Sequence, residues 1–450
     1  MPSNAKMRSI LNAGLSSLEA VLRPVLRDGR PADRILSSHF RQHREYGGRD
    51  RRFISETVFA TLRWWGWLRH LECSPETRLI EDDSDVPRQD LARLALAAVL
   101  LDNQSLRPEL WEAFCTLTAA PPARVESIRM KATASERLKS LWTLFATPVK
   151  HPPSWHDLMP AWVLPEVTIT SQHDRLIDYL QRRPPLWLRC RPNAARPVIA
   201  ELTEKTGIAP RPHPTIPCAL QIRQSRVSLY ETDGYRRGQY EVQDLASQAA
   251  GMVCAPRPGE RWWDACAGGG GKTLLLAEMM ERKGTVVASD IREYKLKDLR
   301  RRARRAELPN VETKPWDGKS VRSRKATFDG VLVDAPCTCS GTWRRNPDGR
   351  WTTRPEEPAE MAALQLEILQ AAATAVKPGG TLVYITCSMF GVENEGVVNA
   401  FTQKNDQFEL QSFAHPLTGD RCQGMLAIRP WEGDCDILFA ARWQKNQLES

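Results

Sequence analysis

The sequence predicts a multidomain α/β protein whose C-terminal part, from about residue 236, forms a Rossmann-like, mainly parallel sheet. Three observations support this fold class. A chain of 450 residues is too long for one compact core. Helical periodicity dominates its first third, and short apolar strands alternate with helices in its second half. We therefore expect three domains, over residues 1–147, 148–235 and 236–450.

Residues 1–147 are predicted to form an all-α domain. Ile54, Val58, Leu62 and Trp65 recur at spacings of three and four, which places them on one face of a helix. The segments LARLALAAVLLD and ASERLKSLWTLFA continue the helical character, and no alternating strand pattern competes with it.

A small α/β module is predicted over residues 148–235. The proline-rich segment TPVKHPPSWHDLMP interrupts the helical pattern near residue 150. After it, PLWLRCRP and ALQIRQS are typical of strands, and AARPVIAELTEKTG is typical of a helix that ends at glycine.

The region from residue 236 alternates strands with helices, which indicates βαβ units and a mainly parallel sheet. Its predicted strands are RWWDA, TVVASD, FDGVLVDA, TLVYITCS and DILFAARW. Ligands of such sheets bind beyond the carboxyl ends of the strands. The basic helix KLKDLRRRARRAEL is expected to pack on the sheet through Leu296 and Leu299. Its arginines then form either a solvated face or a secondary contact for RNA.

Composition favours a polyanionic partner and a reducing compartment. The net charge is +9, from 63 Lys and Arg against 54 Asp and Glu, which suits RNA or DNA. The 11 cysteines are an odd number without a disulfide-type framework. No apolar run approaches the ~20 residues that span a bilayer, and no signal peptide is evident. We expect a cytoplasmic protein with no membrane association.

The glycine-rich segment DACAGGGGKT predicts a cofactor site. A Walker loop would need glycine at Cys266, so an ATPase is disfavoured. Asp290 ends the next strand about twenty residues later, where an acidic side chain can accept hydrogen bonds from ribose hydroxyls. This pattern favours S-adenosylmethionine or a dinucleotide over ATP. The alternative is a glycine turn that serves only strand-to-helix packing.

Two cysteines at strand ends predict covalent chemistry. Asp334 and Cys337 follow one predicted strand, and Cys387 ends another. Attack of a thiolate on carbon 6 of cytosine activates carbon 5 toward methylation, and an acid such as Asp334 can stabilise the adduct at N3. A buried, inert cysteine is the ordinary alternative for each thiol taken alone. A zinc site is not expected, because the CTC segment lacks the usual spacing.

These segments resemble the RsmB/Sun (Nol1/Nop2/Sun) family of RNA cytosine-5 methyltransferases. DAPCTCSGTWRRNPDGRW is similar to the family's fourth motif, YITCSMFGVENEGVV to its Thr-Cys-Ser motif, and VQDLASQ to the signature that precedes the methyltransferase domain. The resemblance is looser over PLWLRCRPN, which is similar to the family's small RNA-binding-type module. The first 145 residues resemble its NusB-like helical domain.

The resemblance implies the roles of individual residues. Cys387 is implied as the nucleophile and Cys337 as the cysteine that assists product release, with Asp334 and Lys272 at the catalytic centre. Implied S-adenosylmethionine contacts are Cys266, Ala267, Gly268, Gly269, Gly270, Gly271, Lys272, Asp290, Asp317 and Asp334. Arg344 and Arg345 are expected at substrate phosphates. Gly268 and Gly269 replace the family's usual Ala-Pro, at a cost of about 1 kcal/mol in loop ordering.

We therefore expect an S-adenosylmethionine-dependent RNA cytosine-5 methyltransferase that acts as a monomer on small-subunit (16S) ribosomal RNA without a metal. Transfer RNA or DNA as substrate is an alternative. Another is a non-catalytic RNA-binding or ribosome-assembly factor that keeps the fold.

Overall fold

The computed structural model describes residues 4–71, 79, 85–145, 153–168, 171–222, 228–319 and 325–447. The chain divides into two compact units. The first comprises Met1–Pro165, Ile169–Arg182 and Trp343–Arg354, and the second Glu166–Thr168, Arg183–Thr342 and Pro355–Ser450. The predicted small module thus shares a unit with the C-terminal sheet, and a short C-terminal segment belongs to the first unit.

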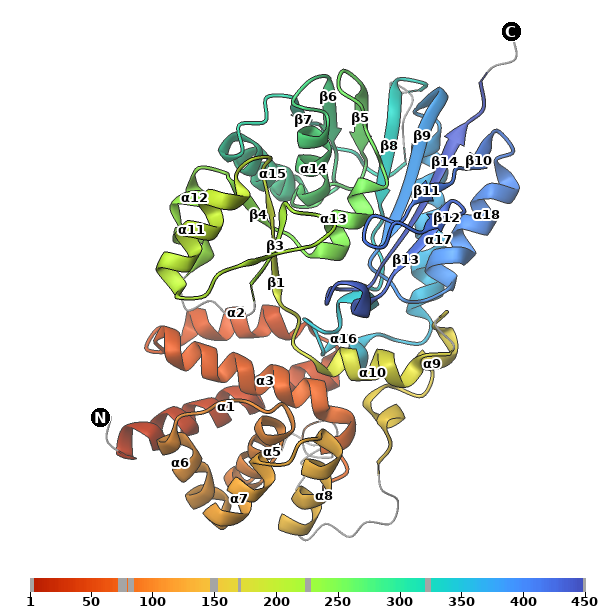
Figure 1. Ribbon diagram of the computed structural model, residues 1–450. Coiled ribbons are helices and arrows are strands. Elements are labelled where there is room, and N and C mark those ends of the chain that lie inside the picture. The colour runs from red at the N-terminus through yellow and green to blue at the C-terminus, as the bar shows by residue number, and fades with distance from the viewer. Residues whose placement is uncertain are drawn as a thin grey trace. The chain divides into compact units, whose positions relative to one another are not determined.

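The first unit is helical, as the periodicity predicts (Figure 1). Its helices are α1 (Asn4–Asp28), α2 (Ala32–Gln42), α3 (Gly48–Leu68), α5 (Arg88–Leu101), α6 (Pro108–Thr118), α7 (Pro122–Arg129), α8 (Ala134–Leu144), η1 (Trp155–Leu158), α9 (Val163–Glu166), α10 (His173–Gln181) and α16 (Gly349–Thr352). Every residue of α5 from Leu91 to Leu101 except Arg93 is buried, because this helix is apolar all round. Helix α5 packs against α3, and α3 packs against α1.

Residues 343–354 form part of the core of this first unit. The guanidinium of Arg350 is fully buried and donates to the backbone carbonyls of Arg63, Leu158 and Leu180. Trp351 Nε1 donates to the Leu62 carbonyl over 2.7 Å. The segment therefore supplies hydrogen-bond donors that carbonyls of the helical unit would otherwise lack.

The small module of the second unit is a four-stranded sheet in the order β2-β3-β1-β4, with antiparallel neighbours. Its strands are β1 (Leu186–Cys190), β2 (Arg211–Pro212), β3 (Ala219–Ile222) and β4 (Tyr240–Val242), and α11 (Ala195–Thr206), η2 (Leu229–Glu231) and α12 (Asp233–Arg236) accompany them. Strand β4 lies beyond the domain boundary predicted at residue 235. It nevertheless belongs to the small sheet, because Tyr240 pairs with Cys190 of β1.

The large sheet has the order β10-β14-β9-β8-β5-β6-β7, and β13 pairs with β14. Its strands are β5 (Arg261–Asp264), β6 (Thr285–Ala288), β7 (Val311–Thr313), β8 (Phe328–Asp334), β9 (Val376–Thr386), β10 (Phe408–Leu410), β13 (Met425–Ile428) and β14 (Leu438–Lys445). Strands β5 to β9 run parallel, and β14 is antiparallel to both β9 and β10. The mainly parallel sheet is confirmed. Its order matches the dinucleotide-binding order 3-2-1-4-5-6 with one antiparallel strand inserted before the last.

Helices cover both faces of the large sheet (Figure 1), and an apolar layer lies on each face. One contains residues of α13 (Leu245–Met252) and α14 (Gly271–Met279), and the other residues of α17 (Glu357–Ala373) and α18 (Val397–Lys404). Short elements complete the unit: η4 (Ser340–Thr342), η5 (Val392–Gly396), β11 (Phe413–Ala414), β12 (Arg421–Cys422) and η6 (Pro430–Glu432). Within the described ranges, no helix has the length and apolarity to span a membrane.

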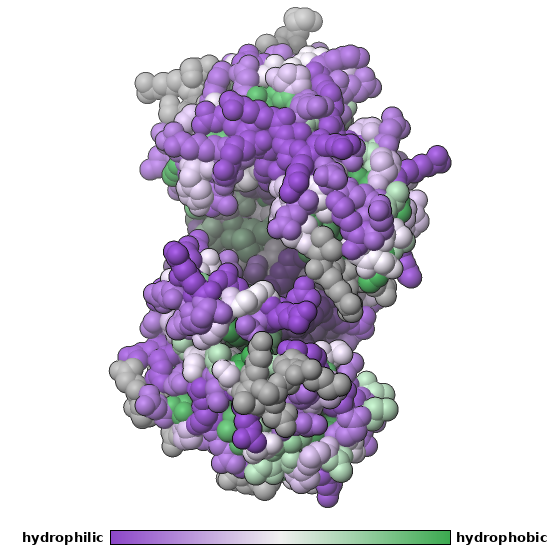
Figure 2. All heavy atoms as spheres, turned by 90° about the vertical axis from the view of Figure 1, so that its left-hand side faces the viewer, coloured by the Kyte–Doolittle hydropathy of each residue, from purple (hydrophilic) through white to green (hydrophobic). Residues whose placement is uncertain are grey.

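Helix α15 (Glu293–Arg305) has two distinct sides. Leu296 and Leu299 are buried, as the sequence predicts, whereas Arg300, Arg301 and Arg304 are exposed. Figure 2 shows the face of the second unit that carries this helix, where hydrophilic side chains gather. The helix packs through its apolar stripe and presents these three cations to solvent, whereas Arg302 and Arg305 are half-buried and pair with Glu241.

Candidate active site

The catalytic residues predicted from the sequence gather at the carboxyl ends of β5, β8 and β9, three neighbouring parallel strands. Asp264 ends β5, Asp334 ends β8, and Cys387 directly follows β9. From β5 the chain continues to β6 and β7 on one side of the sheet, and it then crosses to β8 on the other side of β5. A sheet of this type binds its ligand at such a switch point.

The glycine loop adopts a conformation that requires glycine at one position. Gly270 has a φ of +86°, and a Cβ atom there would lie 2.5 Å from Cγ of Leu299. Gly268 also has a positive φ, of +52°, and no atom lies within 4 Å of its hypothetical Cβ. Gly268 N donates to Asp290 Oδ2 over 2.9 Å, so the loop is tied to the end of β6. The loop leads directly into α14, and the N-terminus of a helix offers backbone amides that favour a negatively charged group.

Asp290, the predicted ribose acceptor, is buried and bonded to a half-exposed arginine. Its carboxylate accepts from Arg292 N over 2.8 Å and from Arg292 Nε over 3.0 Å. Burial raises the pKa of Asp290, but the hydrogen bonds from Arg292 and Gly268 outweigh it and the pKa is lowered. Asp290 is therefore an ionised acceptor, and the Arg292 side chain occupies part of its acceptor capacity.

Asp264 is a buried carboxylic acid that is only partly satisfied. Its Oδ2 accepts from Thr273 Oγ1 over 2.6 Å, whereas Oδ1 receives no hydrogen bond within the described part of the chain. Burial raises the pKa of Asp264 to about 7, against the lowering effect of the Thr273 bond. An unsatisfied buried acceptor favours a ligand that brings a donor or a positive charge.

Lys272 and Asp334 form an ion pair beside the glycine loop. Lys272 Nζ lies 2.8 Å from Asp334 Oδ2, and only 9% of the lysine side chain is exposed. Burial alone would lower the pKa of Lys272, but attraction to Asp334 prevails and the pKa is raised. The charge of Cys387 also acts in this direction, so the ammonium lies within electrostatic reach of that thiol.

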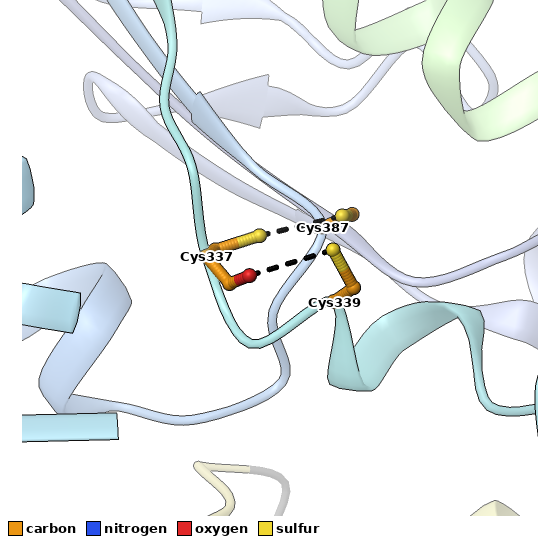
Figure 3. A group of neighbouring side chains, drawn as sticks. All are labelled: Cys337, Cys339 and Cys387. Carbon is orange, nitrogen blue, oxygen red and sulfur yellow. Dashed lines mark hydrogen bonds between the residues drawn. The ribbon is translucent and has the colours of Figure 1, made fainter. Parts of the chain in front are cut away.

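Three cysteines meet at this end of the sheet (Figure 3). The sulfurs of Cys337 and Cys387 lie 3.3 Å apart, and Cys339 Sγ donates to the Cys337 carbonyl over 3.4 Å. All three sulfurs lie within 4.8 Å of one another. Hydrogen bonds from Cys337 and Cys387 lower the pKa of Cys339. Hydrogen bonds to Cys339 and Cys387, together with burial, raise the pKa of Cys337. The hydrogen bond from Cys337 lowers the pKa of Cys387, but the hydrogen bond to Cys339 and burial outweigh it, so the pKa of Cys387 is raised as well.

Glu393 of η5 holds both cysteine segments in place. Its carboxylate accepts from Thr338 N over 3.0 Å and Thr338 Oγ1 over 2.6 Å, and also from the hydroxyl of Ser388. Thr338 lies between Cys337 and Cys339, and Ser388 follows Cys387. One buried carboxylate thus fixes two loops that are about fifty residues apart in the chain.

A second layer of buried groups supports Glu393. Gln365 of α17 donates from Nε2 to Glu393 Oε1 and to the Pro336 carbonyl, each over 2.9 Å. Tyr384 of β9 donates from its hydroxyl to Gln365 Oε1 over 2.8 Å. Burial raises the pKa of Glu393, and the hydrogen bonds that it accepts oppose this effect. No sequence pattern indicates the roles of Glu393, Gln365 or Cys339, although Glu393 lies in a segment on which the resemblance depends.

The remaining predicted cofactor contacts lie in or near the glycine loop. Cys266 is half-buried, and burial raises the pKa of its thiol. Ala267, Gly269 and Gly271 continue the loop into α14, and the Gly269 carbonyl accepts from Arg302. Asp317 is exposed beyond β7 and accepts from Lys319 N over 2.9 Å.

The expected phosphate contact of Arg344 needs correction. Arg344 is fully buried in the helical unit, where its Nε donates to the Arg182 carbonyl over 3.3 Å. Its guanidinium also lies 5.7 Å from the ring centroid of Tyr179. A side chain that is inaccessible to solvent does not meet phosphates, so Arg344 has a packing role. Arg345 is half-buried in the same segment, and its expected phosphate contact stays a prediction.

The chain is similar to known proteins in both sequence and structure. Residues 251–444 match the family model described as 16S rRNA methyltransferase RsmB/F. "Ribosomal RNA small subunit methyltransferase B" of Serratia proteamaculans is 34% identical over 279 residues, which cover 58% of this chain and 64% of the relative. The protein of that name from Salmonella paratyphi C is 34% identical over 264 residues, which cover 58% of this chain and 61% of the relative. The chain thus spans about six-tenths of the length of these curated relatives.

Two solved structures share the fold. "Crystal Structure of PH0851" has a TM-score of 0.72 and 25% identity and covers 96% of this chain and 99% of its own. NSun6 from Pyrococcus horikoshii, solved with SFG, has a TM-score of 0.55 and 19% identity and covers 64% of this chain and 98% of its own.

Proposed function

We propose that the chain, whose residues 251–444 match the family model of 16S rRNA methyltransferases RsmB/F, is an enzyme of that family and methylates carbon 5 of a cytosine in small-subunit ribosomal RNA. The methyl donor is S-adenosylmethionine. The observation that carries the proposal is the pair of thiols, Cys337 and Cys387, 3.3 Å apart at the carboxyl ends of parallel strands.

The residues at β5 and β6 suit S-adenosylmethionine, which supplies an electrophilic methyl group on a positively charged sulfur. Asp264 offers an unsatisfied buried oxygen to the amine of the donor. Asp290 offers an ionised carboxylate to ribose hydroxyls once the Arg292 side chain moves away. The segment Cys266–Lys272 leaves open space beside Gly268, and Asp317 and Asp334 complete the proposed contacts.

Cys387 is the proposed nucleophile. Its thiolate attacks carbon 6 of the cytosine, and the sulfur–carbon bond converts carbon 5 into an enamine-like nucleophile. Burial disfavours this thiolate, so it needs local support. The hydrogen bond from Cys337 lowers the pKa of Cys387, and the Lys272 ammonium attracts the same charge.

Asp334 is the proposed partner of the pyrimidine edge. It uses Oδ2 to accept from Lys272, and this bond fixes the orientation of the carboxylate. The proton that N3 takes up can pass from the Lys272 ammonium through this carboxylate, which then accepts a hydrogen bond from N3–H and stabilises the adduct. Lys272 positions Asp334 and neutralises its charge when the site is empty of substrate.

Cys337 is proposed to complete the cycle. After methylation, the proton on carbon 5 leaves to a base, and the electrons of that bond expel the Cys387 thiolate from carbon 6. The sulfur of Cys337 lies close enough to the nucleophile to act at this stage. The target base must leave its stack to enter the site.

The experiment is transfer of labelled methyl from S-adenosylmethionine to unmethylated 16S RNA, with transfer RNA and DNA as competing substrates. Cys387→Ala is expected to abolish transfer while binding of S-adenosylhomocysteine is retained. Cys422→Ala replaces a half-buried cysteine outside the site and is the matched control. Turnover by Cys387→Ala would contradict the nucleophile assignment, and exclusive methylation of transfer RNA would contradict the substrate. Bisulfite mapping of the product tests the position of the methyl group.

A further inference from the structure

The cluster of Cys337, Cys339 and Cys387 has one more thiol than the proposed reaction uses. Each residue offers one sulfur, and the three sulfurs lie within 4.8 Å of one another. Two come from one loop and the third from the end of β9, so only the folded chain brings them together (Figure 3). The spacing of the CTC segment alone disfavours zinc. Spacing along the chain does not show that the distant Cys387 lies beside Cys337 and Cys339.

The backbone of Cys339 is held in an unusual conformation. Its φ is +56°, in the left-handed region that favours glycine, and this costs a residue with a Cβ atom about 1 kcal/mol. This conformation accompanies a sulfur position that faces back toward Cys337 and Cys387 (Figure 3). Fractional exposure is higher for Cys339 than for its two neighbours, so the cluster is reached from solvent on this side.

We propose that these three cysteines form a binding site for a thiophilic divalent ion such as zinc. Zinc binds sulfur at about 2.3 Å, which separates two ligand sulfurs by roughly 3.8 Å in a tetrahedron. The 3.3 Å between Cys337 and Cys387 and the 4.8 Å limit for all pairs bracket this value. Small side-chain rotations therefore suffice to close the site. Three protein ligands leave the fourth position open to water, and thiolates select soft ions over magnesium or calcium.

Nearby cations balance the charge of such a site. Three thiolates and one divalent ion carry a net charge of −1. The Lys272 ammonium pairs with Asp334 at the end of β8, and the Arg292 guanidinium pairs with Asp290 just beyond β6, so both cations lie at the same edge of the sheet as the cluster. Each cysteine that is still a thiol loses its S–H proton to solvent as its metal–sulfur bond forms, with no change in oxidation state.

The consequence for activity rests on the proposed function. A bound ion would engage the Cys387 sulfur and remove the nucleophile from use. Zinc at the cluster would therefore inhibit methyl transfer reversibly, and a chelator would restore it. Cys339 would act as an additional ligand without taking part in the methylation itself.

The test uses the full chain, kept reduced, with Cd²⁺ as a spectroscopic probe and neither RNA nor methyl donor present. We expect a thiolate-to-metal charge-transfer band that saturates at one ion per chain, and displacement of the probe by Zn²⁺. Cys339→Gly should weaken Cd²⁺ binding at least about tenfold. Mutation of a residue that only orients a metal ligand already weakens metal affinity by about that factor, and loss of a ligand itself should cost more. Glycine suits a φ of +56°, so this variant keeps the fold.

Cys422→Ser is the matched control and should bind the probe as the unchanged chain does. Absence of the band, or equal affinity in Cys339→Gly, would overturn the proposal. Equal loss in Cys422→Ser would also overturn it, because the ion would then lie elsewhere. Since the readout needs no catalysis, an inactive chain that still binds Cd²⁺ refutes the methyltransferase proposal and leaves the metal site intact.

Discussion

Replacement of Asp264 by asparagine should change how stability depends on pH. Burial raises the pKa of this carboxyl from 3.8 to about 7, despite the Thr273 hydrogen bond. The raised pKa belongs to the folded state, so between about pH 4 and 7 the folded chain keeps a proton that the unfolded chain releases. The contribution of Asp264 to the free energy of unfolding is therefore fully present below about pH 4 and is lost as the pH rises to about 7. The loss is of order 4 kcal/mol, from about three pKa units at ~1.4 kcal/mol each.

The assay compares the free energies of unfolding of the unchanged chain and Asp264→Asn between pH 4.5 and 8. Tryptophan fluorescence can follow the transition, because Trp263 precedes Asp264 in β5. Asparagine keeps an oxygen for Thr273 but carries no titrating proton, and slopes from other groups cancel in the difference. The variant should gain relative stability as pH rises. A difference that stays constant with pH would refute the reasoning that burial governs this carboxyl.

Three further predictions concern groups around the site. Glu393→Ala should lower the free energy of unfolding by about 3–5 kcal/mol in denaturant titration, because buried donors including Thr338 lose a charged acceptor. Glu393→Gln should lower kcat more than it raises KM in steady-state kinetics, and an unchanged kcat would contradict a positioning role for Glu393. Arg350→Met should cost about 3 kcal/mol, since buried carbonyls lose their donor, and a change within 0.5 kcal/mol in denaturant titration would contradict that account. Arg292→Ala should tighten binding of S-adenosylhomocysteine several-fold in calorimetry, because Asp290 is freed of a competing donor, and weaker binding would show that Arg292 contacts the ligand.

The sequence predicts those parts of the site that follow from strand ends. Asp264, Asp334 and Cys387 each follow an apolar run, and parallel strands bring their carboxyl ends to one edge. The glycine loop is equally local, since a positive φ at Gly270 and the start of α14 both lie within it. Such features need only the pattern of neighbouring residues. The mainly parallel sheet and the helical N-terminal region are accordingly confirmed.

Features that depend on distant segments were not predicted. Phosphate contact was predicted for Arg344, but its guanidinium bonds a carbonyl of the helical unit, because the sequence pattern does not distinguish a buried arginine from an exposed one. Arg350, to which the sequence assigned no role, likewise bonds carbonyls of that unit. Glu393 bonds Thr338 across about fifty residues, and no local pattern indicates that distance. Cys339 joins Cys337 and Cys387 for the same reason.

The most direct test of the proposed mechanism is covalent trapping of RNA by Cys337→Ala. If Cys387 attacks the base and Cys337 assists release, this variant should accumulate an adduct that survives a denaturing gel and maps by mass spectrometry to the peptide of Cys387. The adduct should require S-adenosylmethionine and disappear in the Cys337→Ala, Cys387→Ala double variant. Full turnover without an adduct, or an adduct on Cys339, would contradict the account.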